Sequence, residues 1–256
     1  MTNPEKTPIA LITGGSRGLG RAMALHLAQR GVDIIFTYRA KAAEANEVQE
    51  RIRAFGRKAV ALQFDVTDTG KFDAFARSVA EELEHTWGRE QFDYLVNNAG
   101  VSMHAGVFET TEAQLDEVYK VNFKGPFLLT KHLLPMIVDG GRILNVSSGL
   151  ARMTIPGSGV YGAMKAGLEA LTRYMAKELG TRRITANIIA PGAIATDFSG
   201  GMVRDNPEVA KMITSMTALG RVGQPDDIGG AVAMLLSPDF GWLNGQRIEV
   251  SGGQSL

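Results

Sequence analysis

Short apolar runs alternate with helical segments along almost the whole chain. The runs are unbroken, as in IALI at residues 9–12 and NIIA at residues 187–190, which is typical of strands buried on both faces of a parallel sheet. The expected strands are residues 9–13, 32–37, 58–64, 93–96, 142–146, 184–189 and 247–250. The expected helices are residues 22–29, 41–55, 71–86, 112–134, 160–179 and 226–236. This alternation predicts an α/β fold, a doubly wound parallel sheet with helices on both faces.

The chain is long enough for one α/β domain with a sizeable core. Its 256 residues contain no repeat, linker or low-complexity segment, so we expect residues 1–256 to form a single domain. Residues 193–223 have the least regular pattern of the chain.

Composition excludes several classes of function. The 27 basic and 27 acidic residues cancel, which leaves no electrostatic footprint for nucleic acid. No basic amphipathic helix or long apolar run points to a membrane. Cysteine is absent, which excludes disulfides, thiolate nucleophiles and cysteine-ligated zinc, and we expect no metal site. The first residues, MTNPEKTP, lack the pattern of a signal peptide, so we expect a soluble cytoplasmic protein.

Three polar residues in the second half of the chain suggest proton chemistry. Tyr161 and Lys165 are four residues apart on an expected helix and therefore share one face, and Ser148 follows the preceding strand. An ammonium lowers the pKa of a neighbouring phenol, and a hydroxyl can hold a substrate oxygen. Together they could exchange a proton with a carbonyl or carbinol oxygen. The pair of Tyr161 and Lys165 alone is more simply interpreted as a buried tyrosine and a solvated lysine.

A glycine-rich loop, GGSRGLG at residues 14–20, lies between the first expected strand and the first expected helix. Glycine lets the backbone turn tightly and approach a pyrophosphate at the N-terminus of the helix. Met23 occupies the last glycine position of a G-x-G-x-x-G fingerprint, and Arg21 and Ala22 replace the Lys-Ser/Thr pair of a P-loop. The loop has the context of a dinucleotide site but matches neither template.

Residues 14–18 also match the G-x-S-x-G elbow of a hydrolase, in which Ser16 would be the nucleophile. That mechanism needs a histidine downstream of Ser16. The histidines at positions 26 and 132 fall within expected helices, the one at 85 lies at a polar helix end, and only His104 could reach a substrate. A serine hydrolase would leave Ser148, Tyr161 and Lys165 without a function, so it is a remote alternative.

Several motifs follow one another in a fixed order along the chain. Residues 13–20 read TGGSRGLG, and after them come Asp65-Val66, Asn97-Asn98-Ala99-Gly100, Asn122, Ser148, Tyr161 with Lys165, and Pro191-Gly192 with Thr196. The chain thereby resembles the short-chain dehydrogenase/reductase family over almost its whole length, including its C-terminal pattern at residues 220–228 and 244–253. The resemblance implies a Rossmann-like sheet of about seven strands in the order 3-2-1-4-5-6-7 and an NADP-type carbonyl or keto reductase.

The resemblance also implies roles for single residues. Tyr161 would be the acid/base, Ser148 would hold the substrate oxygen, and Lys165 would bind the nicotinamide ribose and lower the pKa of Tyr161. Asn122 would anchor a water that joins Lys165 to bulk solvent. The residues implied to bind the cofactor are Gly14, Ser16, Gly18, Leu19, Gly20, Asp65, Val66, Asn97, Ala99, Gly100, Tyr161, Lys165, Pro191, Gly192, Ile194 and Thr196.

The end of the second expected strand predicts NADP(H) rather than NAD(H). An acid at this position accepts hydrogen bonds from the free 2′-hydroxyl of NAD, whereas a nearby arginine accommodates the 2′-phosphate of NADP. Tyr38 occupies the acid position, Arg39 follows it, and Arg17 in the glycine loop could reach the same phosphate. Two guanidinium groups can grip a phosphate through forked, charge-assisted bonds.

The expected substrate is a small or medium apolar ketone, aldehyde or secondary alcohol. Residues 193–223 correspond to the mobile substrate lid of the family, and here they carry Phe198, Met202, Met212 and Met216. Methionine adapts to varied apolar shapes. The alternative is a 3-oxoacyl-carrier-protein reductase of fatty acid synthesis, for which Arg182 could meet the acidic carrier. The family resemblance also implies a homotetramer assembled through the helices at residues 112–134 and 160–179.

Overall fold

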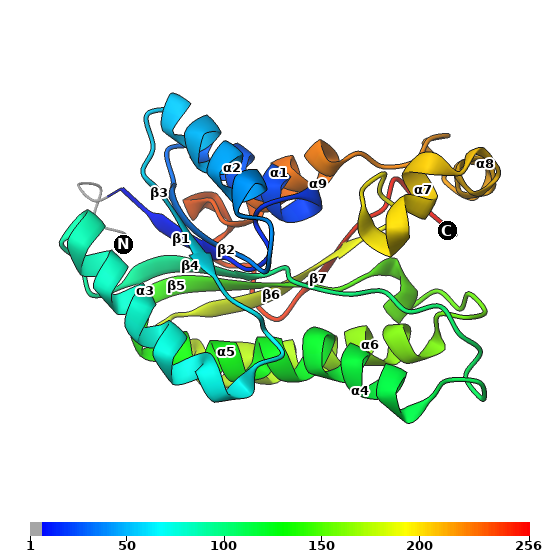
Figure 1. Cartoon of the computed structure of the whole chain (residues 1–256), viewed down its shortest axis with the longest axis horizontal. Coiled ribbons are helices and arrows are strands. Elements are labelled where there is room, and N and C mark those ends of the chain that lie inside the picture. The colour runs from blue at the N-terminus through cyan, green and yellow to red at the C-terminus, as the bar shows by residue number, and fades with distance from the viewer. Residues whose placement is uncertain (1–6) are drawn as a thin grey trace.

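Seven parallel strands form the central sheet of the structure, a computed structural model that describes residues 7–256 (Figure 1). Residues 1–6, where we expect no targeting signal, lie outside the described part. The strands are β1 (Ile9–Ile12), β2 (Asp33–Tyr38), β3 (Ala59–Gln63), β4 (Phe92–Asn97), β5 (Ile137–Val146), β6 (Thr185–Pro191) and β7 (Arg247–Val250). Their order is β3-β2-β1-β4-β5-β6-β7, which confirms the predicted fold class and strand order. Between β1 and β4 the winding reverses direction, and such a point is where doubly wound sheets bind ligands.

Helices cover both faces of this sheet. In Figure 1, α1, α2 and α9 lie above the sheet, whereas α3, α4, α5 and α6 lie below it. Their bounds are α1 (Gly18–Gln29), α2 (Ala42–Ala54), α3 (Phe72–Trp87), α4 (Glu112–Tyr119), α5 (Gly125–Leu133), α6 (Gly159–Glu178), α7 (Met202–Asp205), α8 (Pro207–Ser215) and α9 (Pro225–Leu235). No helix within residues 7–256 combines the length and the apolar character needed to cross a bilayer.

Several elements differ from the sequence-based prediction. Helices α7 and α8 lie within residues 193–223, where no helix was expected. Strand β5 begins at Ile137 rather than at residue 142, because the sequence DGG at residues 139–141 hides the start of the strand. The single helix expected at residues 112–134 is divided into α4 and α5 by a π-helical segment at Lys120–Lys124. Pro126, next to this segment, lacks an N–H and cannot continue the regular hydrogen-bond ladder. Such segments occur often at functional sites.

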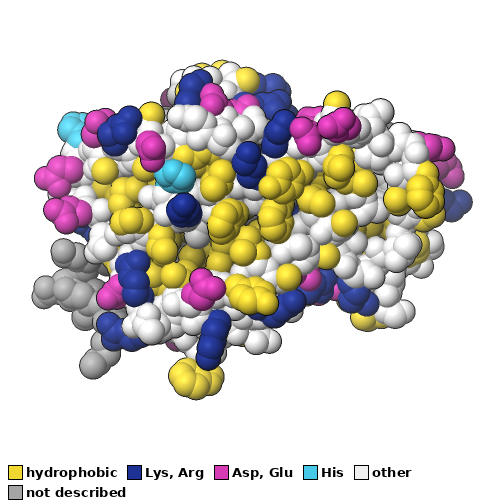
Figure 2. All heavy atoms as spheres, turned by 90° about the horizontal axis from the view of Figure 1, so that it is seen from below, with side chains coloured by type: hydrophobic (Ala, Val, Ile, Leu, Met, Phe, Trp, Pro, Cys, Tyr) yellow, Lys and Arg dark blue, Asp and Glu magenta, His cyan; other side chains and the backbone are white. Residues whose placement is uncertain are grey.

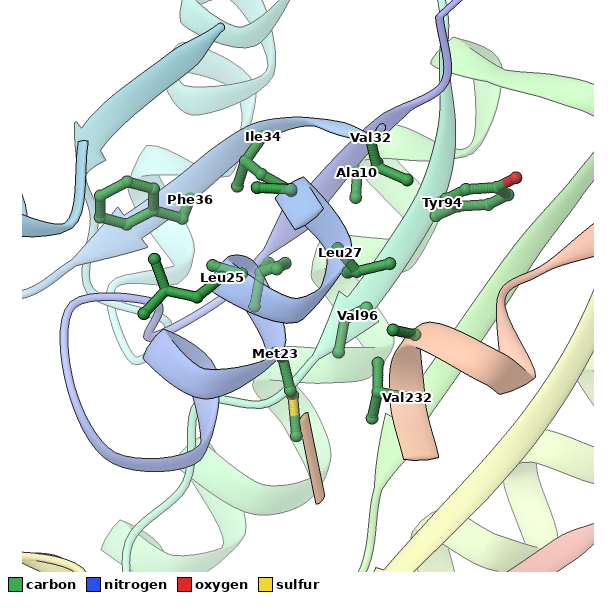
Figure 3. Packing of buried hydrophobic residues seen from close by; sticks show 14 of the residues in the cluster. Ala10, Met23, Leu25, Leu27, Val32, Ile34, Phe36, Tyr94, Val96 and Val232 are labelled. Carbon is green, nitrogen blue, oxygen red and sulfur yellow. The ribbon is translucent and has the colours of Figure 1, made fainter. Parts of the chain in front are cut away.

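The packing of α1 fixes the direction in which its N-terminus points. Met23 and Leu27 of α1 are buried against β1, β2 and β4, together with Val232 of α9 (Figure 3). Each fully buried side chain of this size contributes about 1.5–3 kcal/mol. A Cβ atom at Gly229 of α9 would lie 2.8 Å from the carbonyl oxygen of Ala22, so only glycine permits this approach of the two helices. The helix is thus held rigidly behind the glycine-rich loop.

Candidate functional site

A cavity of about 700 Å³ opens at the carboxyl ends of β1, β4, β5 and β6. Eighteen of the twenty predicted site residues line it, and only Asn97 and Asn122 do not. Those that line it are Gly14, Ser16, Arg17, Gly18, Leu19, Gly20, Arg39, Asp65, Val66, Ala99, Gly100, Ser148, Tyr161, Lys165, Pro191, Gly192, Ile194 and Thr196. The fold therefore brings together residues that are spread over most of the chain.

The glycine-rich loop leaves no room for side chains at two of its positions. Gly14 has a φ of +67°, which favours glycine. A Cβ at Gly20 would lie 2.2 Å from the carbonyl oxygen of Gly14. A Cβ at Gly15 would lie 2.6 Å from that of Phe36, a packing constraint that the sequence motif does not reveal. The loop is a cradle of bare backbone on the cavity wall.

The N-terminus of α1 points into this cradle without a side-chain cap. Arg17 precedes the helix, and no side chain accepts a hydrogen bond from its first turn. Uncapped N–H groups and the helix dipole favour an anion at this position. The residues present therefore fit the pyrophosphate of a dinucleotide.

Hydrogen bonds join the glycine-rich loop to the turn after β4. Thr13 Oγ1 accepts from the backbone N–H groups of Asn98 and Ala99, both at 2.9 Å. The Asn98 side chain donates to the carbonyl oxygen of Thr13 at 2.8 Å, and Gly14 N–H donates to Thr37 Oγ1 at 3.0 Å. These contacts fix the spacing between two walls of the cavity.

The end of the cavity next to β2 carries a free cation. Tyr38 ends β2, and both Tyr38 and the exposed Arg39 line the cavity. Within residues 7–256 the guanidinium of Arg39 makes no hydrogen bond or ion pair. Arg17 lies 4.0 Å from Asp197, measured from Nη1 to Oδ2. Asp65 Oδ1 accepts hydrogen bonds from Thr67, at 2.9 Å from its N–H and 2.8 Å from its hydroxyl.

Ser148, Tyr161 and Lys165 meet at the opposite end of the cavity. Tyr161 and Lys165 stand one turn apart on α6 and are 6% and 4% exposed. Lys165 Nζ lies 5.7 Å from the centre of the Tyr161 ring and donates to the carbonyl oxygen of Val146 at 2.9 Å. Ser148 follows β5, and its hydroxyl accepts from the N–H of Leu150 at 3.2 Å. The simpler interpretation, in which Lys165 is solvated, does not describe this arrangement.

Burial controls the protonation of both groups. It raises the pKa of Tyr161 to about 12, although the hydrogen bond with Ser148 lowers that pKa in part. It lowers the pKa of Lys165 to about 8. The net direction for Tyr161 is opposite to the lowering expected from Lys165, because desolvation outweighs the neighbouring groups. At neutral pH Tyr161 is a neutral phenol, the form that can donate a proton to a carbonyl oxygen.

Asn122 lies behind this cluster, inside the π-helical segment, and is fully buried. Its amide group donates to the carbonyl oxygens of Val101 and Val118, at 2.9 Å and 3.1 Å. Its buried Oδ1 has no hydrogen-bond partner in the described residues. A Cβ at Gly100 would lie 3.1 Å from this oxygen and 3.6 Å from Lys165 Nζ, so the two polar atoms flank one small space. A buried acceptor of this kind fits a water.

Asn97 joins β4 to β5 and α5 through its side chain and does not line the cavity. Its side chain donates to Asn145 Oδ1 at 2.8 Å and to Thr130 Oγ1 at 3.0 Å. Alternation along β4 turns the Asn97 side chain away from the cavity. The predicted contact with a ribose therefore finds no geometric support at Asn97, in contrast to Ala99 and Gly100.

The loop after β6 is tied to the C-terminal residues. Ala193 N–H donates to Gln254 Oε1 at 2.9 Å, and Gly192 N–H donates to the carbonyl oxygen of Val250 at 3.1 Å. Gln254 is 4% exposed and lines the cavity, but no sequence motif identified it. Thr196 lies beside the glycine-rich loop, since a Cβ at Gly18 would approach its side chain to 3.8 Å.

Apolar residues surround the end of the cavity near Tyr161. Phe198 lies above Tyr161, with 6.2 Å between the ring centres. The methionines expected in this region, Met202, Met212 and Met216, line the cavity. Other apolar lining residues were not identified from the sequence, because they lie in loops or in the short helices α7 and α8, where no regular element was expected: Val101, Met103, Leu150, Met153, Ile155, Val203, Val209 and Ile213.

The arrangement does not support a serine hydrolase. Ser16 lies in the glycine-rich cradle, and no histidine of the described part of the chain is hydrogen-bonded to it. His26 faces Asp226 at 3.2 Å, and His132 bonds to the carbonyl oxygen of Leu128 at 2.7 Å. His104 lines the cavity rim against Gly157.

Comparison with known proteins agrees with this geometry. A family model described as enoyl-(acyl carrier protein) reductase matches residues 14–255. The hydroxynaphthalene reductase-like protein Arp2 of Metarhizium brunneum is 36% identical over 270 residues, which cover 99% of each chain. The promiscuous reductase LugOII, which catalyses keto-reduction in lugdunomycin biosynthesis, is 35% identical, with a TM-score of 0.93 and coverage of 99% of this chain and 100% of that one.

A further solved structure bears on the cofactor. The angucycline C-6 ketoreductase LanV, with NADP bound, has a TM-score of 0.92 and 36% identity over 97% of this chain and 95% of that one. The family model and these relatives each cover nearly the whole chain, and the glycine cradle and the cluster of Ser148, Tyr161 and Lys165 occupy one cavity. The chain belongs to the short-chain dehydrogenase/reductase family.

Proposed function

We propose that the protein is an NADP(H)-dependent oxidoreductase that transfers a hydride between the nicotinamide and a ketone, an aldehyde or a secondary alcohol. The observation that carries this proposal is the placement of Ser148, Tyr161 and Lys165 in the same cavity as the glycine-rich cradle. Tyr161 donates its proton to the substrate oxygen in reduction and accepts it in oxidation. Ser148 holds that oxygen beside Tyr161, and Asn122 holds a water next to Lys165.

The chain provides a matching set of cofactor contacts. When bound, the nicotinamide supplies the hydride in reduction and accepts it in oxidation. Backbone of the glycine-rich loop and the N-terminus of α1 would bind the pyrophosphate, and Asp65 and Val66 would flank the adenine. Lys165 would bind the nicotinamide ribose, and the loop from Pro191 to Thr196 would hold the nicotinamide.

The preference for NADP(H) rests on the free guanidinium of Arg39 at the adenosine end. No acid follows β2 to accept hydrogen bonds from an unmodified ribose. Arg17 lines the same cavity, where it also faces Asp197. NADP in the LanV structure supports this preference.

The apolar end of the cavity favours small or medium apolar substrates. Residues 193–223 would form a lid within a single domain of residues 1–256, with Phe198 closing over Tyr161. Fused aromatic ketones are the most informative substrates within this class, because Arp2 is named for hydroxynaphthalene and LanV for angucycline. Methionine side chains can adapt to such flat rings.

The position of Arg182 does not favour the alternative, a 3-oxoacyl-carrier-protein reductase, in which this residue was expected to meet the carrier. Arg182 donates to Asp139 Oδ1 at 2.8 Å and to the carbonyl oxygen of Leu134 at 3.0 Å, near the start of β5. The cavity lies at the other end of β5, about 30 Å away along a strand of this length. Turnover of acetoacetyl-carrier protein in preference to simple ketones would restore this alternative.

A homotetramer agrees with the surface below the sheet. Figure 2 shows hydrophobic side chains gathered over the face that carries α4, α5 and α6. Phe127 and Tyr174 are 40% and 67% exposed there, which is unusual for large aromatic rings without a partner. We propose that copies of this chain cover the face, and that the assembly is cytoplasmic.

The decisive test is reduction of a ketone panel by the purified protein with NADPH, compared with the variant Tyr161→Phe. This change removes one hydroxyl, so the variant should fold and bind NADPH. Its turnover should fall by about 10²–10⁴-fold, the typical contribution of general acid catalysis. A variant that keeps more than about a tenth of the wild-type rate would remove Tyr161 from the mechanism.

A further inference from the structure

The loop that leaves β5 is held from two directions at consecutive residues. The Ser147 hydroxyl donates to Glu169 Oε1 at 2.6 Å, and the carbonyl oxygen of Ser148 accepts from Arg247 Nη2 at 3.3 Å. Glu169 lies on α6, one turn beyond Lys165, whereas Arg247 begins β7. The backbone of Ser148 is therefore fixed by an element that carries none of the proposed catalytic residues.

Two carboxylates in turn fix Arg247. Its Nε donates to Glu169 Oε1 at 2.8 Å and its Nη1 to Glu249 Oε2 at 2.7 Å. The side chains of Arg247, Glu169 and Glu249 are 22%, 12% and 18% exposed, so the bonds are shielded from solvent. Arg152 donates to Glu249 at 3.0 Å and 3.2 Å, and the Ser251 hydroxyl donates to it at 2.9 Å. We name Glu169, Arg247 and Glu249 the Arg247 brace.

The planar guanidinium of Arg247 fixes the relative positions of three elements. Its three nitrogens are fixed in one plane, and each donates to a different element: α6, β7 and the loop after β5. Although burial raises the pKa of Glu249, hydrogen bonds from Arg152, Arg247 and Ser251 lower it to about 2. Glu249 therefore stays charged at neutral pH, and its hydrogen bonds with Arg247 are charge-assisted, which makes them stronger than bonds between neutral groups.

We propose that Arg247 is a positioning residue for Ser148: it sets the place of the Ser148 hydroxyl relative to Tyr161 on α6. This inference rests on the proposed function, in which Ser148 holds the substrate oxygen beside Tyr161. A displacement of about 1 Å at a reacting centre can lower a rate by about 10²-fold. Among residues 7–256, no hydrogen bond or ion pair joins the glycine-rich loop to the brace, so loss of the brace should affect catalysis more than cofactor binding.

The test is a double-mutant cycle between Arg247→Met and Ser148→Ala. If Arg247 acts through Ser148, Arg247→Met lowers kcat/KM for a ketone by at least about tenfold in the wild-type background. In the Ser148→Ala background it lowers kcat/KM by less than about twofold, because the group that it positions is already gone. The dissociation constant of NADPH stays within about twofold of the wild-type value.

Arg182→Met is the matched control. Arg182 also joins a carboxylate to backbone carbonyl oxygens, but near the start of β5, so its loss tests general destabilisation alone. The proposal would be overturned if Arg247→Met lowered kcat/KM by the same factor in the wild-type and Ser148→Ala backgrounds. It would also be overturned if Arg247→Met lowered kcat/KM no more than Arg182→Met does. If Arg247→Met does not fold, Arg247→Lys takes its place in the cycle, because lysine keeps the charge but loses the fork.

A readout without substrate separates this proposal from the proposed function. If the wild-type protein reduces no ketone, the proposed function fails, and amide hydrogen exchange at residues 149–153 decides the positioning role. The N–H of Ala151 donates to the carbonyl oxygen of Ser148 that Arg247 holds. Arg247→Met should speed exchange in this segment whereas Arg182→Met should not, and unchanged exchange in Arg247→Met would refute the brace.

Discussion

Lys165→Met is expected to stabilise the folded protein at pH 7. Burial lowers the pKa of Lys165 from 10.5 to about 8. Each pKa unit corresponds to about 1.36 kcal/mol, so holding the charged lysine in the fold costs on the order of 3 kcal/mol. Methionine has a similar length and no charge, although it gives up the hydrogen bond to Val146, which contributes about 1.5–3 kcal/mol. The free energy of unfolding of Lys165→Met should therefore exceed that of the wild-type protein by about 1 kcal/mol at pH 7.

The effect of Lys165→Met on stability depends on pH, and this dependence shows whether the buried charge of Lys165 causes it. The folded state binds the Lys165 proton less tightly than the unfolded chain does. The cost is therefore fully present below about pH 8 and disappears between about pH 8 and the unperturbed pKa of 10.5. Raising the pH from 7 to 10 should shift the stability difference by about 2 kcal/mol in favour of the wild-type protein.

Urea unfolding of both proteins at pH 7 and pH 10, without cofactor and at equal protein concentration, measures this difference. Lys177→Met is the control, since Lys177 is an exposed lysine on the same helix. It should show no such dependence on pH. The argument would be refuted if the wild-type protein were more stable than Lys165→Met by the same amount at pH 7 and at pH 10. In that case the burial of the Lys165 charge would not determine the difference in stability.

Three further predictions concern cofactor, pH and assembly. The kcat/KM with NADPH should exceed that with NADH by at least about tenfold, the lower limit for one charge-assisted hydrogen bond, and Arg39→Asp should reverse the order; equal or better rates with NADH would contradict it. Because Tyr161 keeps its proton up to a pKa of about 12, the rate of alcohol oxidation should rise with pH to at least 10, and a plateau below pH 9 in a stopped-flow measurement would count against it. Light scattering should give about four times the chain mass of 27.5 kDa, with Phe127→Glu lowering it, and a monomer mass for the wild-type protein would refute the proposed tetramer.

The sheet could be predicted because each strand is a short apolar run, and the motif order implied the strand order. The start of β5 could not, since Asp139, Gly140 and Gly141 lack strand propensity. The π-helical segment was also missed, because a helical pattern gives no sign of one wider turn. Asn122 owes its placement to that turn, so the sequence identified the residue without the geometry that exposes its oxygen to the space beside Lys165.

The sequence predicted those features of the site that depend on local spacing, but not those that depend on burial in the folded protein. The spacing of Tyr161 and Lys165 placed them on one face of a helix, but it could not reveal that both are at least 94% buried. Desolvation therefore reversed the expected direction of the Tyr161 pKa shift. The contact of Arg247 with Glu169 joins residues 78 apart in the sequence, and no pattern in either segment points to the other.

The Arg247 brace also explains why Lys165 remains without a carboxylate. Lys165 and Glu169 are four residues apart on α6, a spacing at which lysine and glutamate normally attract each other. Here Glu169 accepts instead from Arg247 and Ser147, and Lys165 donates to the carbonyl oxygen of Val146. A carboxylate beside Lys165 would raise its pKa and hold its ammonium away from the cavity. Because Glu169 binds Arg247, the ammonium of Lys165 has no carboxylate partner on α6 and stays at the wall of the cavity, where we propose that it binds the ribose. The free-energy cost of burying this charge is then the cost of keeping it available for the cofactor.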